Sequence, residues 1–192
     1  MKFKKIINTI SISRDIFKSY INEGNVVLDA TTGNGNDTLD LARLVGYKGK
    51  IYGFDIQSIA IENTKRLLTE NNQLENVVLI NDSHVNIDKY IDEPLDLAIY
   101  NLGYLPKGDK NIKTDAENTV LSVSKALNLL KGNGILVIIS YIGHPGGLEE
   151  KEALEKMLNG LNQKEYNVLK NEFINQKNFP PLLYIVEKAN HI

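Results

Sequence analysis

Two acidic residues and a glycine-rich turn form the part of this sequence best suited to chemistry. A short apolar run, Val26–Leu28, ends in Asp29, and a turn with Gly33 and Gly35 precedes an expected helix. Glycines let the backbone come close to a ligand, and the unpaired N–H groups of a helix start point into the same space. A second apolar run ends in Asp55, 26 residues after the first acid. This pattern predicts a nucleotide site.

The two acids favour S-adenosylmethionine over a nicotinamide dinucleotide. A dinucleotide fold expects a third glycine where this sequence has Thr38. Asp29 suits the cationic amino acid end of S-adenosylmethionine, and Asp55 can accept hydrogen bonds from both ribose hydroxyls. We therefore expect S-adenosyl-L-methionine as the methyl donor and S-adenosyl-L-homocysteine (SAH) as the product. A tight turn without a ligand is the alternative.

A third apolar run is followed by Asp82, Ser83 and His84. Asp82 could accept a hydrogen bond from the adenine amine, or it could cap the short helix expected next. His84 could orient a substrate or accept a proton, although a packed or solvated histidine is the favoured interpretation.

The segment Asn101–Pro106 occupies the place where many amino-group methyltransferases carry Asn-Pro-Pro-Tyr. A nitrogen nucleophile must lie in line with the sulfur–methyl bond, and the carboxamide oxygen of Asn101 can accept its hydrogens and fix that direction. Tyr104 could stack on a base or shield the sulfonium, and Gly103 leaves the approach open. A plain loop is the less favoured alternative.

Two further segments could contact a substrate. Lys107, Lys110 and Lys113 suit the phosphates of a nucleic acid, and a solvated loop explains them equally well. The glycine-rich segment Tyr141–Gly147 could form a wall of the substrate site, with Tyr141 or His144 against the base.

Apolar runs and helical patterns alternate along the chain, which predicts how these residues are positioned. Helices are expected over Thr9–Ile21, Asn36–Val45, Ser58–Glu70, Thr114–Leu130 and Leu148–Leu161, with a short helical piece ending near Ile91. Strands are expected over Val26–Asp29, Lys50–Asp55, Val77–Ile80, Leu95–Tyr100 and Ile135–Tyr141, with a closing antiparallel pair over Tyr166–Phe173 and Leu182–Val186. Ser58 is expected to be the N-cap of the helix over Ser58–Glu70. Lys131-Gly132 is expected to end the helix over Thr114–Leu130.

The alternation predicts an α/β fold, a Rossmann-like, doubly wound, mostly parallel sheet of seven strands. One domain is expected over residues 1–192, with an N-terminal leading helix. Ligands of such sheets bind beyond the carboxyl ends of the strands, and each motif above falls at such an end.

Composition narrows the function further. The absence of cysteine excludes disulfides, thiolate metal sites and a cysteine nucleophile, and we expect no metal. A net charge of −2 argues against a broad grip on a long duplex but allows a local basic patch for a small RNA hairpin. No run approaches the roughly 20 apolar residues of a membrane helix, and the basic N-terminus lacks a cleavage site. We expect a cytoplasmic protein without a membrane partner.

These motifs together resemble one family, the small bacterial methyltransferases labelled rRNA methylases, which includes the MnmM type. The matching segments, in order and spacing over about residues 1–188, are DATTGNGNDT, GFDIQ, YNLGYLPKGDK, SYIGHPGGLEE and FPPLLYIVEK. Enzymes of the MnmM type methylate the aminomethyl group of 5-aminomethyl-2-thiouridine at the wobble position of tRNA. The resemblance implies a Rossmann-like fold, S-adenosylmethionine as cofactor and a tRNA anticodon stem-loop as partner, and a homodimer is left open.

Pattern and resemblance together predict three groups of site residues. The cofactor-binding residues are Asp29, Thr31, Gly33, Asn34, Gly35, Asn36, Asp37, Asp55, Gln57, Asp82, Ser83, His84 and Asn101. The catalytic residues are Asn101, Tyr104, His84 and His144. The substrate-binding residues are Leu102, Gly103, Tyr104, Lys107, Lys110, Lys113, Tyr141 and His144. Asp29, His84, Tyr104 and His144 are open alternatives for the proton acceptor.

The favoured function is a tRNA wobble-uridine N-methyltransferase. An rRNA or small-molecule methyltransferase on the same fold is the second hypothesis. A nucleotide-binding module without chemistry, or an NAD enzyme, is the third.

Overall fold

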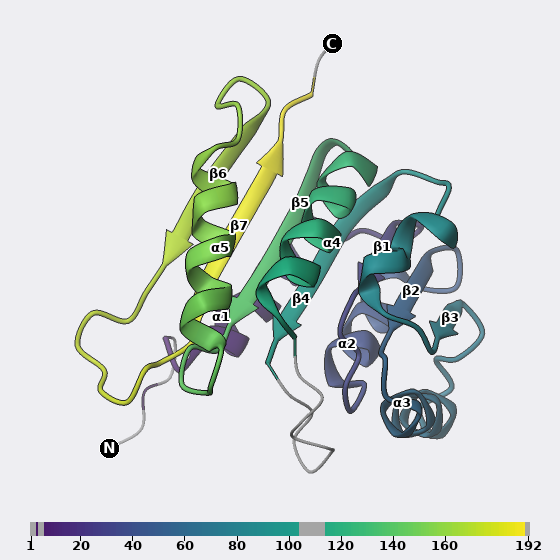
Figure 1. Cartoon of the computed structure of the whole chain (residues 1–192). Coiled ribbons are helices and arrows are strands. Elements are labelled where there is room, and N and C mark those ends of the chain that lie inside the picture. Colours follow the sequence, from purple (N-terminus) through teal and green to yellow (C-terminus); the bar gives the residue numbers. More distant parts are fainter. Residues whose placement is uncertain (1–2, 4–5, 104–113, 191–192) are drawn as a thin grey trace.

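The computed structural model describes residues 3, 6–103 and 114–190, which form one sheet with helices on both faces (Figure 1). The strands are β1 (Val26–Asp29), β2 (Lys50–Phe54), β3 (Val77–Ile80), β4 (Leu95–Leu102), β5 (Leu130–Ser140), β6 (Tyr166–Asn171) and β7 (Leu182–Lys188). The helices are α1 (Thr9–Tyr20), α2 (Asn36–Val45), α3 (Ser58–Glu70), the 3₁₀ helix η1 (His84–Lys89), α4 (Ala116–Leu129) and α5 (Gly147–Asn159).

The seven strands lie in the order β3-β2-β1-β4-β5-β7-β6. The first five in this order pair in parallel, whereas β7 pairs antiparallel with both β5 and β6. The predicted doubly wound, mostly parallel sheet of seven strands is confirmed.

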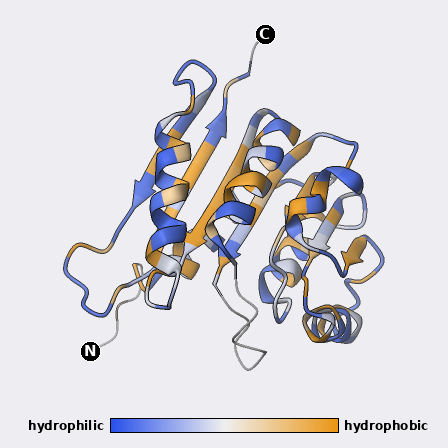
Figure 2. Ribbon diagram, in the orientation of Figure 1, coloured by the Kyte–Doolittle hydropathy of each residue, from blue (hydrophilic) through white to orange (hydrophobic). Residues whose placement is uncertain are grey.

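Two apolar layers hold the helices against the sheet, because neighbouring residues of a strand point to opposite faces. In β1, Val27 packs with Phe17 of α1 and the apolar residues of α2. The next residue, Leu28, packs with Val123 of α4 and Leu154 of α5. Helices α4 and α5 therefore cover one face, in front in Figure 1, and α1, α2 and α3 cover the other. Figure 2 shows the central strands as largely apolar, and the helices α4 and α5 in front of them as a mixture of polar and apolar residues.

The winding of the sheet reverses between β1 and β4, and this position determines where the site lies. Helix α2 follows β1 on one face, and α4 follows β4 on the other. In doubly wound sheets the crevice at such a switch point, beyond the carboxyl ends of the strands, is where ligands bind.

The junction of α4 and β5 differs from the sequence prediction. Helix α4 ends at Leu129, with Leu130 as its C-cap, so the helix end lies within one residue of the predicted end, but the prediction that Gly132 stops the helix is wrong. Strand β5 begins at once, because Leu130 pairs with Leu95 across the sheet. A Cβ at Gly132 would lie 2.6 Å from Oδ1 of Asn190, so this glycine permits a close contact with the end of the chain and does not stop a helix.

The predicted cap at the start of α3 is also wrong. Gln57, and not Ser58, is the N-cap, and its side chain does not cap the helix. The backbone N–H of Gln57 instead donates to Oδ1 of Asp55 at 3.0 Å. The acid that ends the β2 segment therefore organises the entry to α3.

None of the described helices is long and apolar enough to cross a membrane.

The C-terminal end of α4 yields a prediction about stability. The ammonium of Lys188 donates to the carbonyl oxygens of Leu127, Asn128 and Leu130 at 3.2, 3.3 and 2.6 Å. A helix end leaves these carbonyls unpaired unless another group bonds them. We expect Lys188→Met to lower the free energy of unfolding by about 1–2 kcal/mol, because hydrogen bonds to a charged donor are lost at a part-exposed site. Urea unfolding measures this change, and a variant with wild-type stability would contradict the assignment.

Candidate active site

Asp29, at the carboxyl end of β1, is a deeply buried acid of the site. The residue is 1% exposed. Its Oδ2 accepts a hydrogen bond of 2.6 Å from the Thr38 hydroxyl, and its Oδ1 accepts one of 3.2 Å from the Thr31 N–H. Burial raises the pKa of Asp29 to about 7, and these hydrogen bonds only partly oppose the rise. Ionising this carboxyl therefore costs free energy that a bound cation would offset.

The turn after β1 adopts a backbone conformation that favours glycine at two positions. Gly33 and Gly35 have φ values of 55° and 80°, in the left-handed region that side chains disfavour. A Cβ on Gly35 would lie 2.9 Å from the Cα of Thr64, so the turn packs directly on α3. Gly35 is also the N-cap of α2, and no side chain caps that end. The first N–H groups of α2 are therefore suited to bind a ligand.

Asp55 connects the two loops that the sequence assigned to the cofactor. Its Oδ2 accepts from the N–H of Gly33 at 2.9 Å, and its Oδ1 accepts from the N–H of Gln57 at 3.0 Å. Burial raises the pKa of Asp55, and the two N–H donors oppose that rise. A carboxylate offers about four acceptor positions, so two remain for the predicted bonds to ribose hydroxyls.

The residues after β3 bond mainly to one another. Asp82 accepts from Ser83 N, from Nδ2 of Asn86 and from the hydroxyl of Tyr90 at 2.7, 3.0 and 2.9 Å. These bonds, led by that of Asn86, lower the pKa of Asp82. The cap of η1 is Ser83, whose Oγ accepts from Val85 N, so Asp82 is not the cap. The adenine role of Asp82 stays a prediction.

His84 lies against the core. Its ring packs edge to face against the ring of Tyr100, with 5.8 Å between the two ring centroids. Its backbone oxygen accepts a hydrogen bond of 2.8 Å from the Ser122 hydroxyl. Burial lowers the pKa of His84 to about 4, so the imidazole is neutral at physiological pH. Its Nδ1 is buried without a hydrogen-bond partner among the described residues.

Asn101, near the end of β4, joins the turn after β1 to the start of α2. Its backbone N–H donates to Oγ1 of Thr31 at 2.7 Å. Its side-chain Nδ2 donates to Oδ2 of Asp37 at 3.2 Å, and Asp37 is the second residue of α2. The neighbouring Leu102 is fully buried in the core. Only the backbone of Leu102 could therefore contact a substrate, and its predicted substrate role stays a prediction.

The predicted substrate wall lies beside β4. A Cβ on Gly103, whose φ is 151°, would lie 3.8 Å from Cβ of Tyr141 and 3.9 Å from Nε2 of His144. Burial, followed by the charge of Asp37, raises the pKa of Tyr141. The phenol therefore stays protonated and can donate a hydrogen bond.

Two hydrogen bonds close the base of the segment that follows β4. Gly103 N donates to Oγ1 of Thr114 at 3.0 Å, and Thr114 N donates to the oxygen of Gly103, also at 3.0 Å. The predicted residues Tyr104, Lys107, Lys110 and Lys113 lie outside the described residues.

Glu150 is a site residue that sequence reasoning missed, because an acid in the first turn of a helix usually serves the helix dipole. It is 1% exposed, and its oxygens accept from the hydroxyls of Thr114 at 3.0 Å and Thr119 at 2.5 Å. Burial raises the pKa of Glu150. The carboxyl group joins the starts of α4 and α5 to the base of the segment after β4.

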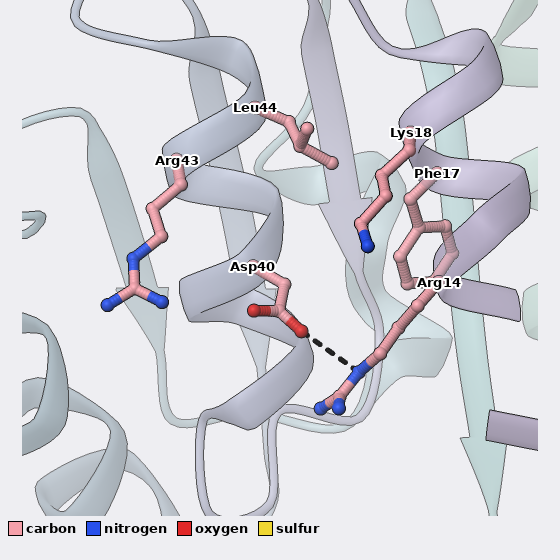
Figure 3. A pocket seen from close by; sticks show the side chains of 6 residues that line it. All are labelled: Arg14, Phe17, Lys18, Asp40, Arg43 and Leu44. Carbon is pink, nitrogen blue, oxygen red and sulfur yellow. Dashed lines mark ion pairs between the residues drawn. The ribbon is translucent and has the colours of Figure 1, made fainter. Parts of the chain in front are cut away.

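A hollow of about 310 Å³ between α1 and α2 also escaped sequence reasoning (Figure 3). It is lined by Arg14, Phe17, Lys18, Asp40, Arg43 and Leu44. The guanidinium of Arg14 pairs with Asp40, with Nε 2.9 Å from Oδ2. The Nη2 atom of Arg14 lies 3.7 Å from Oδ1 of Asp37, the acid that accepts a hydrogen bond from Asn101.

The hydrogen bonds and contacts above bring most of the predicted site residues together at one edge of the sheet. These are Asp29, Thr31, Gly33, Gly35, Asp37, Asp55, Gln57, Asn101, Gly103, Tyr141 and His144. Asn34 and Asn36 are exposed on the same turn. Among the described residues no group of three acidic or histidine side chains could hold a metal ion.

Residues 51–187 match the model of a protein family described as "Putative rRNA methylase". The chain belongs to this family. It is 34% identical over 189 residues to the chloroplastic tRNA (mnm5s2U34)-methyltransferase of Arabidopsis thaliana, covering 93% of this chain and 69% of that protein.

Two solved structures are similar over 98% of this chain and the whole of theirs. A "putative rRNA-methylase" from Clostridium thermocellum is 46% identical, with a TM-score of 0.94. A protein described as "a putative methyltransferase" from Streptococcus mutans, solved in complex with SAH, is 36% identical, with a TM-score of 0.86. These matches confirm the predicted family. They also confirm the predicted dependence on S-adenosylmethionine.

The ribose assignment predicts that Asp55→Ala weakens the binding of S-adenosylmethionine by at least about 100-fold. Two hydrogen bonds to a charged acceptor are lost, each worth roughly 1.5–3 kcal/mol. Calorimetric titration measures the affinity, and a melting curve separates this loss from unfolding of the Gly33 turn. The exposed Asp92→Ala is the control. A folded Asp55→Ala protein with wild-type affinity would refute the assignment.

The buried Asp29 predicts a pH dependence of stability. Its folded-state pKa of about 7 exceeds the unfolded value, so the folded state holds the proton more tightly. This contribution to the stability of the unliganded protein is present below about pH 4 and is lost as the pH rises through 7. We expect Asp29→Asn to gain stability relative to wild type between pH 5 and 7, by about 1.4 kcal/mol per pH unit. Denaturant unfolding at several pH values measures the gain, and parallel pH profiles for the two proteins would exclude the raised pKa.

Proposed function

We propose that this protein transfers a methyl group from S-adenosylmethionine to the aminomethyl nitrogen of 5-aminomethyl-2-thiouridine at the wobble position of tRNA. The observation that carries the proposal is the position of Asn101 at the carboxyl end of β4, beside the turn and the acids of the cofactor site. The name of the Arabidopsis relative supports the choice of substrate.

The residues at this edge fit the three groups of S-adenosylmethionine. Asp29 would face its ammonium group, Asp55 its ribose, and the start of α2 its carboxylate. When bound, the cofactor supplies an electrophilic methyl group on a positively charged sulfur.

The acceptor amine must be neutral and correctly aimed before transfer. A free alkylamine is mostly protonated at neutral pH, so a proton must leave first. The Asn101 carbonyl can then accept an N–H of the amine and direct its lone pair. The new N–C bond forms as the S–C bond breaks, and the electron pair of that bond stays on sulfur. An exocyclic amine requires no covalent attack on the base ring, which agrees with a chain that contains no cysteine.

Tyr141 and His144 are suited to hold the base in place. Both lie beside Gly103, whose lack of a side chain leaves room above the end of β4. Aromatic rings stack on the unpaired bases of an RNA loop, and a protonated phenol can donate to a base oxygen.

An rRNA methyltransferase is the second candidate, because the family description names rRNA. One assay separates the two functions. The protein is incubated with labelled S-adenosylmethionine and either tRNA that carries 5-aminomethyl-2-thiouridine, tRNA that lacks the aminomethyl group, or ribosomal RNA. Mass spectrometry of the digested nucleosides should find methyl transfer to the first substrate alone. Methylation of ribosomal RNA without methylation of tRNA would overturn the proposal.

Asn101→Ala should lower kcat about 10²–10³-fold while changing the affinity for either substrate little. The aiming of the amine matters most in the transition state, and single preorganised groups of this kind contribute that much. Single-turnover methylation of tRNA measures the effect next to a melting curve. A variant that melts early yet transfers the methyl group at the normal rate would show that Asn101 has a structural role.

A further inference from the structure

We infer that Arg14 and Asp37 are positioning residues, which fix the direction of the Asn101 carboxamide so that its carbonyl oxygen points away from α2 toward the acceptor amine. The inference rests on the proposed function, because it assigns a cause to the orientation on which that function depends.

The first step is the identity of the group that Asp37 binds. An asparagine side chain presents an oxygen and an NH₂ group of nearly the same shape, and only the oxygen can accept a hydrogen from the amine. An ionised carboxylate only accepts hydrogen bonds. Asp37 Oδ2 lies 3.2 Å from the side-chain nitrogen of Asn101, so the NH₂ group faces Asp37 and the oxygen faces the opposite way. The bond from Asn101 N to Thr31 fixes the main chain, which leaves only the side chain to be oriented.

The second step is the charge of Asp37. Its side chain is 13% exposed, and this burial raises its pKa, whereas the guanidinium of Arg14 opposes the rise. Within the described part of the chain, the neutral Asn101 amide, the acids Asp40 and Asp29 and the phenol of Tyr141 also act on Asp37, and none of these supplies a positive charge. A protonated Asp37 could donate to the Asn101 oxygen and reverse the carboxamide. Arg14 therefore keeps Asp37 an acceptor.

The third step is the fixed position of Arg14. Helix α1 begins with a capping box between Asn8 and Ser11 and buries Phe17 completely. Asp37 and Asp40 are three residues apart on α2, so both face the same neighbouring helix. Nε of Arg14 lies 2.9 Å from Oδ2 of Asp40, an ion pair that Figure 3 shows. Nη2 of the same guanidinium lies 3.7 Å from Oδ1 of Asp37. The leading helix thereby acts on the site without touching the substrate.

The kinetic test compares Arg14→Met with Lys18→Met, which removes a cation from the same helix one turn away. In single-turnover methylation of tRNA, Arg14→Met and Asp37→Asn should each lower kcat at least about 10-fold, with KM for tRNA changed less than 3-fold. Lys18→Met should match wild type, and Arg14→Lys should recover part of the rate. The acidic limb of the kcat profile should move to higher pH in Arg14→Met. Equal rates for Arg14→Met and wild type, or an equal loss in Lys18→Met, would overturn the inference.

A second measurement does not depend on the substrate. The side-chain amide signals of Asn101 in a ¹⁵N-labelled protein are identified by their loss in Asn101→Ala. They should titrate with pH in wild type, titrate at higher pH in Arg14→Met and stay constant in Asp37→Asn. If the pH titration of these signals is the same in both variants as in wild type, the inference is overturned, even in an active enzyme. Titration as expected in a protein that leaves tRNA unmethylated would support the network and refute the proposed function.

Discussion

The parallel pairing of β1 with β4 is the constraint on which the whole site depends. Asp29 lies opposite Ile99 in this register, so Asn101 falls two residues further, beside the turn that begins at Thr31. The bond of 2.7 Å between Asn101 N and the Thr31 hydroxyl continues the pairing past the end of β1. The cofactor turn and the segment that aims the acceptor are therefore held at a fixed separation by the sheet itself. A shift of one residue would turn Asn101 to the other face.

Buried acids are the second feature that the site elements share. Asp29, Asp37, Asp55 and Glu150 all lie at or near this edge, and burial raises the pKa of each. Each is held by hydroxyl, amide or backbone N–H donors, which lowers the cost of its charge without cancelling it. Such an edge is preorganised for ligands that carry positive charge, which describes a sulfonium cofactor.

Local patterns in the sequence were enough to predict the fold, and with it the strand ends and turns at which the residues assigned to the cofactor lie. Asp29, Gly33, Gly35 and Asp55 each stand at a strand end or in a tight turn, where residue type and position are coupled over a few residues. The doubly wound, mostly parallel sheet of seven strands followed from the alternation of strands and helices, whereas the order of the strands was not predicted. The start of β5 was predicted five residues too late, because Leu130 pairs with Leu95 ahead of an irregular stretch, and regular pairing resumes only at the predicted start, Ile135.

Contacts between distant segments could not be predicted in the same way. Arg14, Asp37 and Asn101 are separated by 23 and 64 residues, and each has an ordinary local explanation as a surface charge, a helix-start acid or a loop residue. Glu150 likewise resembles its neighbour Glu149 in sequence, and only the fold buries the former against Thr119. These roles depend on which helices share a face, which no short pattern contains.

The paired hydrogen bonds between Gly103 and Thr114 have a consequence for how such enzymes diversify. They fix the two positions that flank residues 104–113, a cassette in the sequence only, on the rigid fold. Substitutions or changes of length within the cassette need not disturb the sheet, the turn after β1 or the buried acids. A lineage can therefore change the sequence between these two positions while the part of the fold that holds the turn after β1 is inherited unchanged.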